Sequence, residues 1–270
     1  MAASDSPGQA YLLDNRAVAA GARFEALSRL YDPSTFRHIR DLGIGPGWRC
    51  WEVGAGGTTV ATWLAGQTGS SGAVLATDID VSRAEAAAAP TVEIRRHDVV
   101  REPPPEGSFD LVHARLVLVH LAERDQALRA MSGALRPGGW LLVEDADPGL
   151  QPLACLETHS AEERLANRLR VGFRKLLAAR GADLEYGRRL PRLFRELGLL
   201  EVAADAYFPV AVPATIELEL ATISLIRDEL LAHGVATEEE IARHLASVAA
   251  GRLDLAQPPL ISARGRKPRR

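Results

Sequence analysis

Apolar residues in the first half of the chain alternate between short continuous runs and stripes with helical spacing. Continuous apolar runs are typical of strands that are buried on both faces of a parallel sheet, and the stripes between them predict covering helices. The runs predict strands at Trp48–Val53, Ala73–Asp78, Val92–His97, Phe109–Ala114 and Trp140–Glu144. The stripes predict helices at Thr58–Gln67, Arg83–Ala89 and Ala122–Leu135, the last ended by a turn at Pro137–Gly139.

The pattern changes after residue 149 to longer helical stripes. Ser160 with Glu163, and Thr237 with Glu240, have the spacing of capping boxes, so each pair predicts the start of a helix. Strands are predicted at Leu199–Phe208 and Pro259–Arg264, with further helices at Leu190–Leu197, Thr215–Leu231 and Glu238–Ala249. We expect residues 150–200 and 213–255 to form helical cap insertions around these late strands.

Upstream of the first strand, residues 11–47 predict N-terminal helices that Asp32-Pro33 interrupts, because the residue before a proline is disfavoured in a helix. Residues 48–147 form the strand–helix core of one domain, which we expect over residues 11–265. The ends of the chain, 1–10 and 266–270, predict a disordered tail and a basic tail.

The composition bounds the class of protein. The 270 residues are 47% hydrophobic and 25% charged, with a net charge of −3. These values are ordinary for a globular protein and give no general attraction to nucleic acid or to anionic membranes. No secretion signal or apolar run of spanning length is evident. We therefore expect a cytoplasmic monomer or homodimer without nucleic-acid or membrane partners. Cysteines and histidines without metal-ligand spacing predict no metal site.

The first candidate ligand-binding residue along the chain is Glu52, which precedes a glycine-rich loop at residues 54–57. Glycines let a backbone turn sharply and approach a ligand closely, and the following helix presents its N-terminus to the same crevice. The third glycine of the dinucleotide fingerprint falls on Thr59, which disfavours a nicotinamide dehydrogenase. An acid before the loop suits a ligand with a cationic group. Asp78, which ends the second strand, lies at the distance expected of a carboxylate that binds ribose hydroxyls.

Three further segments follow in order: Asp98 after the third strand, Phe109–Arg115, and Leu135–Glu144. Together with the loop and Asp78, this series resembles the motifs of class I S-adenosylmethionine-dependent methyltransferases over about residues 48–147. Tyr11–Arg16 and Pro258–Arg264 resemble, more loosely, bacterial small-molecule methyltransferases of the ubiquinone-biosynthesis type. The resemblance implies a Rossmann-like α/β fold, with a mostly parallel seven-stranded sheet, helices on both faces and a helical cap over the active site.

The resemblance also implies roles for individual residues in binding S-adenosylmethionine. Glu52 and the backbone of Gly54, Ala55 and Gly56 would hold the methionine moiety and its ammonium. Asp78 would bind the ribose hydroxyls, and Ile79 would pack on adenine. Further contacts are implied for Asp98 and Val99 at the adenine, for His113, Ala114 and Arg115 under the sulfonium, and for Tyr11 in an N-terminal lid. Thr58 replaces the usual third glycine of the loop, and Gly57 beside it keeps the turn glycine-rich.

Methyl transfer needs a general base only where the acceptor has a proton to lose. His113 is the first candidate for that base, followed by Glu144 and Asp145 at the end of the fifth strand. His120 is expected to be structural. The predicted function is methyl transfer to the O, N or C atom of a small, secondary-metabolite-like acceptor, with S-adenosylhomocysteine as product. The alternatives are a cyclase- or decarboxylase-like enzyme that uses the same cofactor, a nicotinamide oxidoreductase, and a regulator that only binds the cofactor.

Overall fold

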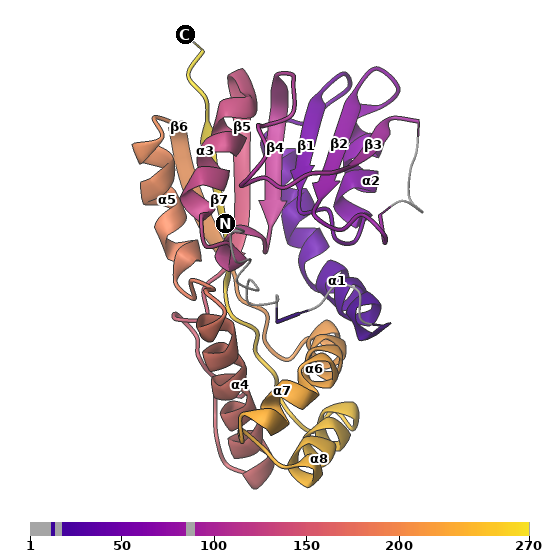
Figure 1. Cartoon of the computed structure of the whole chain (residues 1–270), viewed down its shortest axis with the longest axis vertical. Helices are drawn as coiled ribbons and strands as arrows, with labels where there is room; N and C mark the ends of the chain where they lie inside the picture. Colours follow the sequence, from indigo (N-terminus) through magenta and orange to yellow (C-terminus); the bar gives the residue numbers. More distant parts are fainter. Residues whose placement is uncertain (1–11, 14–17, 85–89, 270) are drawn as a thin grey trace, which may run out of the picture.

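The computed structural model describes residues 12–13, 18–84 and 90–269. Tyr11, most of the Tyr11–Arg16 motif and the end of the expected Arg83–Ala89 helix lie outside these ranges. Figure 1 shows a sheet in the upper part of the molecule and a group of helices below it.

The sheet has seven strands in the order β3-β2-β1-β4-β5-β7-β6. The first five strands are parallel, and β7 runs antiparallel between β5 and β6. This arrangement confirms the expected mostly parallel seven-stranded sheet. The strands are β1 (Arg49–Val53), β2 (Ala73–Asp78), β3 (Val92–Arg96), β4 (Phe109–Arg115), β5 (Leu135–Ala146), β6 (Leu200–Tyr207) and β7 (Leu260–Arg266).

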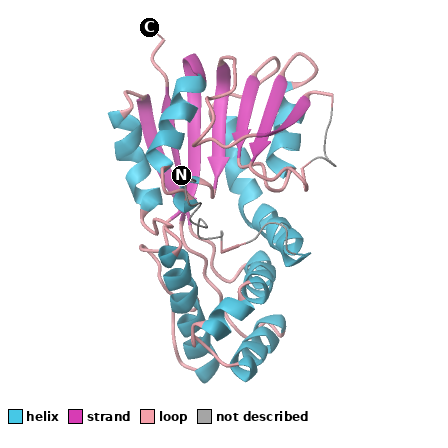
Figure 2. Cartoon of the chain, viewed as in Figure 1, coloured by secondary structure: helices cyan, strands magenta, loops and turns pink. Residues whose placement is uncertain are grey.

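Helices cover both faces of the sheet, as Figure 2 shows. Alternate strand residues separate the two cores: Trp51 and Val112 face α3 and α5, whereas Cys50 and Leu111 face α2 and the end of α1. The helices around the sheet are α1 (Val18–Asp41), α2 (Thr59–Thr68), α3 (Arg124–Ala134), α5 (Tyr186–Glu196) and the short 3₁₀ helix η2 (Leu118–His120).

Four helices form a cap beyond the carboxyl ends of β1, β2 and β4 (Figure 1). A separate apolar core joins α4 to the α6–α8 segment through residues such as Leu169, Leu176 and Ile223. Both predicted capping boxes are present, at Ser160 and Thr237. The cap helices are α4 (Ala161–Ala179), α6 (Pro213–Leu225), α7 (Arg227–Ala232) and α8 (Glu238–Ala249). No helix in the described ranges is long and apolar enough to cross a membrane.

Three local predictions were wrong. The single helix expected at Thr215–Leu231 is two helices, α6 and α7, which are divided at Ile226. Helix α1 continues through Pro33, because its two halves pack into different cores, Leu30 against α6 and Ile39 against α2, and packing overrides local preference. The predicted turn at Pro137–Gly139 lies inside β5. A register irregularity with β4 accommodates it, and a side chain at Gly139 would come within 2.6 Å of the Phe109 carbonyl oxygen.

Candidate active site

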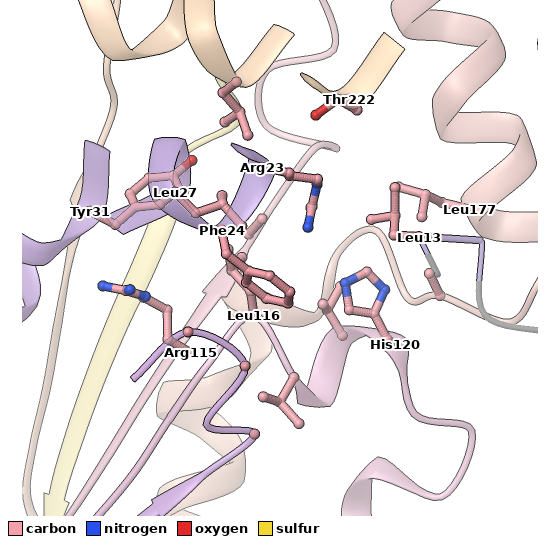
Figure 3. Close-up of a pocket in the computed structure, with 18 of the residues that line it drawn as sticks. Leu13, Arg23, Phe24, Leu27, Tyr31, Arg115, Leu116, His120, Leu177 and Thr222 are labelled. Carbon is pink, nitrogen blue, oxygen red and sulfur yellow. The ribbon is translucent and has the colours of Figure 1, made fainter. Parts of the chain in front are cut away.

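A cavity of about 380 Å³ lies between the carboxyl ends of the parallel strands and the cap. One half, the strand-end half, is formed by the glycine loop after β1, the ends of β2 and β4, and residues 97–99 after β3. The other half, the cap half, is formed by side chains of α4 and α6. Helix α1 lines the junction, where Phe24, Leu27 and Tyr31 face the cavity in Figure 3. The position of the cavity matches the crevice in which open α/β sheets bind ligands.

The glycine loop follows β1 in a conformation that requires glycine. Gly54 and Gly56 have φ angles of 73° and 40°. A Cβ atom at Gly54 would lie 2.2 Å from Val117 Cγ2, and one at Gly56 would lie 2.7 Å from Phe24 Cε1. The amides of Gly54 and Ala55 donate to the Thr77 carbonyl at 2.8 and 2.9 Å, so the loop is fastened to β2.

Asp78, at the end of β2, joins the glycine loop to the cavity wall. Its Oδ2 accepts from the amide of Gly56 at 3.0 Å, and its Oδ1 accepts from the amide of Asp80 at 3.1 Å. Burial raises the pKa of the Asp78 carboxyl, against the lowering effect of these backbone donors. Ile79 beside it lines the cavity with 62% of its surface exposed. An apolar side chain left exposed in a cavity is suited to a flat ligand such as a nucleobase.

Asp98 and Val99 also reach the cavity wall. The Oδ1 atom of Asp98 accepts from the amides of Val100 and Arg101, at 2.9 and 3.2 Å, so this carboxylate caps the turn that follows β3. Asp98 therefore has a structural role in this turn in addition to its place at the cavity.

Glu52 lines the cavity, and its carboxylate contacts His113, which lies outside the cavity lining. The two residues are paired in the register of β1 and β4, and His113 Nδ1 lies 2.5 Å from Glu52 Oε2. On its other side, His113 Nε2 lies 3.3 Å from Glu144 Oε2. Both His113 and Glu144 are fully buried, and neither lines the cavity.

This position decides the protonation of His113. Burial lowers the pKa of the imidazole, but the carboxylates of Glu52 and Glu144 outweigh burial and raise the pKa to about 9. Burial works against the charge of Glu144 as well, yet hydrogen bonds from His113 and His38 hold the pKa of Glu144 well below its usual range. His113 is thus an imidazolium at neutral pH, donating to both acids, and has no free nitrogen with which to accept a proton.

The chain of charged groups continues from Glu144 to the molecular surface. Glu144 accepts from Thr35 and Ser262 and lies 3.0 Å from His38 Nδ1. His38 Nε2 in turn lies 2.8 Å from Asp205 on β6, whose side chain is half-exposed. Because Glu52, Glu144 and Asp205 each have a hydrogen-bond partner in this series of contacts, the buried charges are compensated.

Three other residues were expected to lie near the sulfonium or to act as a base, and only one of them lines the cavity. Arg115 lines the cavity, but its guanidinium donates to Thr35 at 2.9 Å and to Asp32 at 2.8 Å. Ala114 is buried in the sheet core. Asp145 is fully buried away from the cavity, and burial raises its pKa well above the usual range. The structure therefore brings Arg115 to the cavity and leaves Ala114 and Asp145 outside it.

Several cavity residues were not anticipated from the sequence. Figure 3 shows Arg23 of α1 and His120 of η2 pointing toward one another in the cavity. Burial, together with the positive charges of Arg23 and Arg124, lowers the pKa of His120 to about 3, so its imidazole is neutral. Leu116, directly after β4, has a φ of 57° and lines the cavity. A non-glycine residue in this conformation is strained, and such strain is common at functional sites. No local sequence signal marks any of these positions.

Comparison with known proteins bears on the identity of this site. A family described as "Methyltransferase domain" matches residues 51–143, which include the end of β1, the glycine loop and most of β5. The methyltransferase GfsG of Streptomyces halstedii is 29% identical over 164 residues, covering 58% of this chain and 55% of that protein. A ubiquinone/menaquinone biosynthesis C-methyltransferase of Laribacter hongkongensis is 29% identical over 121 residues, covering 43% of this chain and 50% of that protein.

A solved structure extends the likeness beyond the matched domain. A protein of Anabaena variabilis, assigned as a methyltransferase of an antibiotic biosynthesis pathway, has a TM-score of 0.61 at 17% identity, with 88% of this chain and 98% of that chain covered. At this identity the likeness concerns the fold alone. The chain spans about half the length, or less, of the curated relatives named above and of others that it matches. Residues 51–143 therefore form a methyltransferase domain, and the strand order and the cavity at the strand ends agree with the class I S-adenosylmethionine-dependent type of that domain.

Proposed function

We propose that the strand-end half of the cavity binds S-adenosylmethionine and that the protein transfers its methyl group to a small molecule held under the cap. The observation that carries the proposal is Glu52, a carboxylate at the cavity wall beside the glycine loop. The ammonium of the methionine moiety is the cationic group that such an acid suits. Glu52 is fastened by the His113 imidazolium, so its position and charge are set before any ligand binds.

The other polar groups of this half suit the remaining parts of the cofactor. Asp78 would accept hydrogen bonds from the ribose hydroxyls, and Ile79 and Val99 would pack against adenine, with Asp98 at its edge. Arg23 projects into the cavity from α1 (Figure 3) and offers a cationic partner for the methionine carboxylate. Phe24 lies against Gly56 and would help α1 exclude water from this half.

Bound S-adenosylmethionine would supply a methyl carbon activated by the positive charge of its sulfonium. The protein's own contribution is alignment, because the methyl carbon must lie in line with the attacking atom of the acceptor. Proximity and orientation can contribute about 7–11 kcal/mol in well-aligned cases. The apolar side chains of Leu27, Phe173 and Leu177 enclose the space on the acceptor side and limit its water content.

His113 would take no part in proton transfer, because its imidazole is already protonated and does not line the cavity. We propose instead that His113 is a positioning residue for Glu52. His120, which is neutral and lines the cavity, is the group that would accept a hydrogen bond from an O–H or N–H acceptor. An activated carbon would need no such contact. Glu144 and Asp145, which are buried outside the cavity, would not touch the acceptor.

Titration calorimetry with S-adenosylhomocysteine tests the cofactor site. We expect binding by the unmodified protein, and weakening of about tenfold or more in Glu52→Gln and in Asp78→Asn, since each loses a charge-assisted hydrogen bond. Glu106→Gln, which removes an exposed carboxylate that does not line the cavity, is the matched control and should bind as before. Unchanged binding in both cavity variants would show that the cofactor is placed elsewhere.

Formation of S-adenosylhomocysteine from S-adenosylmethionine, measured with a panel of small phenols, amines and activated carbon acids, tests the reaction. Stoichiometric gain of a methyl group by the acceptor supports transfer. Turnover of an acceptor without S-adenosylhomocysteine would support a cyclase- or decarboxylase-like enzyme that uses the cofactor only as a charged group.

A further inference from the structure

The cavity face of α4 carries two arginines one helical turn apart, Arg170 and Arg174. Arg170 is buried and fully compensated: it donates to Glu219 of α6 at 3.1 Å and to the carbonyl of Ala256 at 3.2 Å. Glu219 is also held by His244, whose Nε2 lies 3.0 Å away. This network ties α4, α6 and α8 together, and it accounts for the positive charge of Arg170.

Arg174 has no such compensation. Its Nε atom is buried without a hydrogen-bond acceptor, and no carboxylate in residues 12–13, 18–84 and 90–269 forms an ion pair with it. The side chain nevertheless lines the cavity. A buried donor without a partner costs about 1–3 kcal/mol, and more when the group is charged. A ligand that supplied an acceptor at this point would recover that free energy on binding.

Gln257 provides a second unused donor in the cap half. Its side chain is 6% exposed and lines the cavity, and its Nε2 atom has no acceptor among the residues described. The bond from Arg170 to the Ala256 carbonyl fastens the neighbouring residue of this segment to α4. Gln257 is thereby held beside the helix that carries Arg174.

The two donors define the chemistry of a ligand. A guanidinium and an amide N–H₂ together match the two oxygens of a carboxylate. One uncompensated arginine balances one negative charge, which favours a monoanion over a phosphate dianion. Phe173, Leu177 and Ile223 line the same half, so the body of the ligand would be apolar. A neutral apolar acceptor would leave both donors buried and unpaired.

We infer that the methyl acceptor is a small apolar molecule bearing a carboxylate, which binds to Arg174 and Gln257 in the cap half of the cavity. This inference rests on the proposed function, because it takes the strand-end half as occupied by the cofactor. Arg174 and Gln257 are specificity-determining residues in this account. They hold the acceptor by its carboxylate so that the rest of the molecule extends toward the strand ends.

Calorimetric binding to the protein saturated with S-adenosylhomocysteine tests the inference. The probes are matched pairs of an acid and its neutral amide: cinnamate with cinnamamide, and octanoate with octanamide. We expect the acids to bind at least about tenfold more tightly than the amides, since only the acids form a charge-assisted contact. Arg174→Gln should remove this preference by weakening the acids alone, and Gln257→Leu should reduce it.

Lys175→Gln is the matched control, because it removes a positive charge from the exposed face of α4 at the neighbouring position and should leave the preference intact. Thermal melting confirms that each variant is folded. Equal binding of acids and amides, no binding of either acid at millimolar concentration, or tighter binding of phenyl phosphate than of cinnamate would overturn the inference. S-Adenosylhomocysteine binding is measured first and separately. Its absence would count against the proposed function, whereas its presence without acid selectivity would count against the acceptor class alone.

Discussion

The two halves of the cavity differ in how their polar groups are satisfied before any ligand binds. In the strand-end half, Glu52 is paired with His113, and Asp78 accepts from two backbone amides. In the cap half, Arg174 and Gln257 have buried donors with no acceptor among the described residues. The first half is therefore organised by the protein itself, and the second is completed only by a ligand. This contrast suits a site in which one ligand is a constant cofactor and the other is a particular acceptor.

The contacts that hold these polar groups in position also differ between the two halves. Strand register and the glycine loop place the strand-end groups, and the chain of contacts behind Glu52 runs through Glu144 and His38 to Asp205. Helix packing places the cap groups, through the buried ion pair of Arg170 and Glu219, the contact of Glu219 with His244, and the apolar core of α4 with α6–α8. Substitutions in the strand-end half should therefore affect stability and cofactor binding together.

The largest effect is expected for His113→Leu, which leaves the buried Glu52 carboxylate without its donor. Breaking a buried pair in this way costs about 3–5 kcal/mol. Urea unfolding at neutral pH should show a loss of this size, and S-adenosylhomocysteine should bind more weakly, because Glu52 is no longer held in place. A loss below about 1 kcal/mol would mean that His113 does not support the site.

The pH dependence of unfolding gives an independent readout of the same contact. The pKa of His113 in the folded protein, about 9, lies above its ordinary value of 6.5. The stability due to this imidazolium is therefore fully present below pH 6.5 and is lost as the pH rises through about 9. We expect the protein to lose about 2 kcal/mol more than His113→Leu between pH 7 and pH 9. Parallel curves for the two proteins would contradict the assigned charge.

Gly54→Ala should have the next largest effect. The added Cβ would meet Val117 at 2.2 Å in a backbone conformation with a φ of 73°. Strain and overpacking together should lower the free energy of unfolding by about 2–4 kcal/mol and displace the loop beside the proposed cofactor site. Gly66→Ala is the matched control, because Gly66 lies in α2 with open space around its Cα, and alanine there should be neutral or stabilising. An equal free energy of unfolding in the two variants would show that the loop does not require glycine at position 54.

The smallest effect on the cofactor is expected for Phe173→Ala in the cap half. Phe173 lines the cavity and packs in the core of the cap, so its truncation should destabilise the protein. Affinity for S-adenosylhomocysteine should change by less than about twofold, because distant sites without shared contacts are nearly independent. A large loss of cofactor affinity would show that the two halves are not separate sites.

The strand-end half could be anticipated from the sequence largely because its signals are local. The apolar run Ala73–Asp78 matches β2 as observed, and the acids that end such runs converge because parallel strands carry their carboxyl ends to one edge. The role of His113 could not be anticipated, since its burial between Glu52 and Glu144 depends on the register of three strands. From its position at a strand end alone, His113 was predicted to be a general base that faces the ligand.

The cap half was less accessible to prediction. Capping boxes at Ser160 and Thr237 marked the starts of α4 and α8. The face of α4 that meets the cavity depends on packing against α6, and the Arg170–Glu219 pair joins residues 49 positions apart in the chain. Arg174 differs from its compensated neighbour only in what the fold brings near it. The continuous helix across Pro33 shows the same dependence on long-range contacts.

A crystal structure of the protein with S-adenosylhomocysteine would show directly which half of the cavity holds the cofactor. We expect that the ligand's ammonium lies within hydrogen-bond distance of Glu52, that its ribose hydroxyls reach Asp78, and that the cap half beside Arg174 and Gln257 stays open for the acceptor. A ligand bound with its methionine moiety in the cap half, or away from Glu52 altogether, would contradict it.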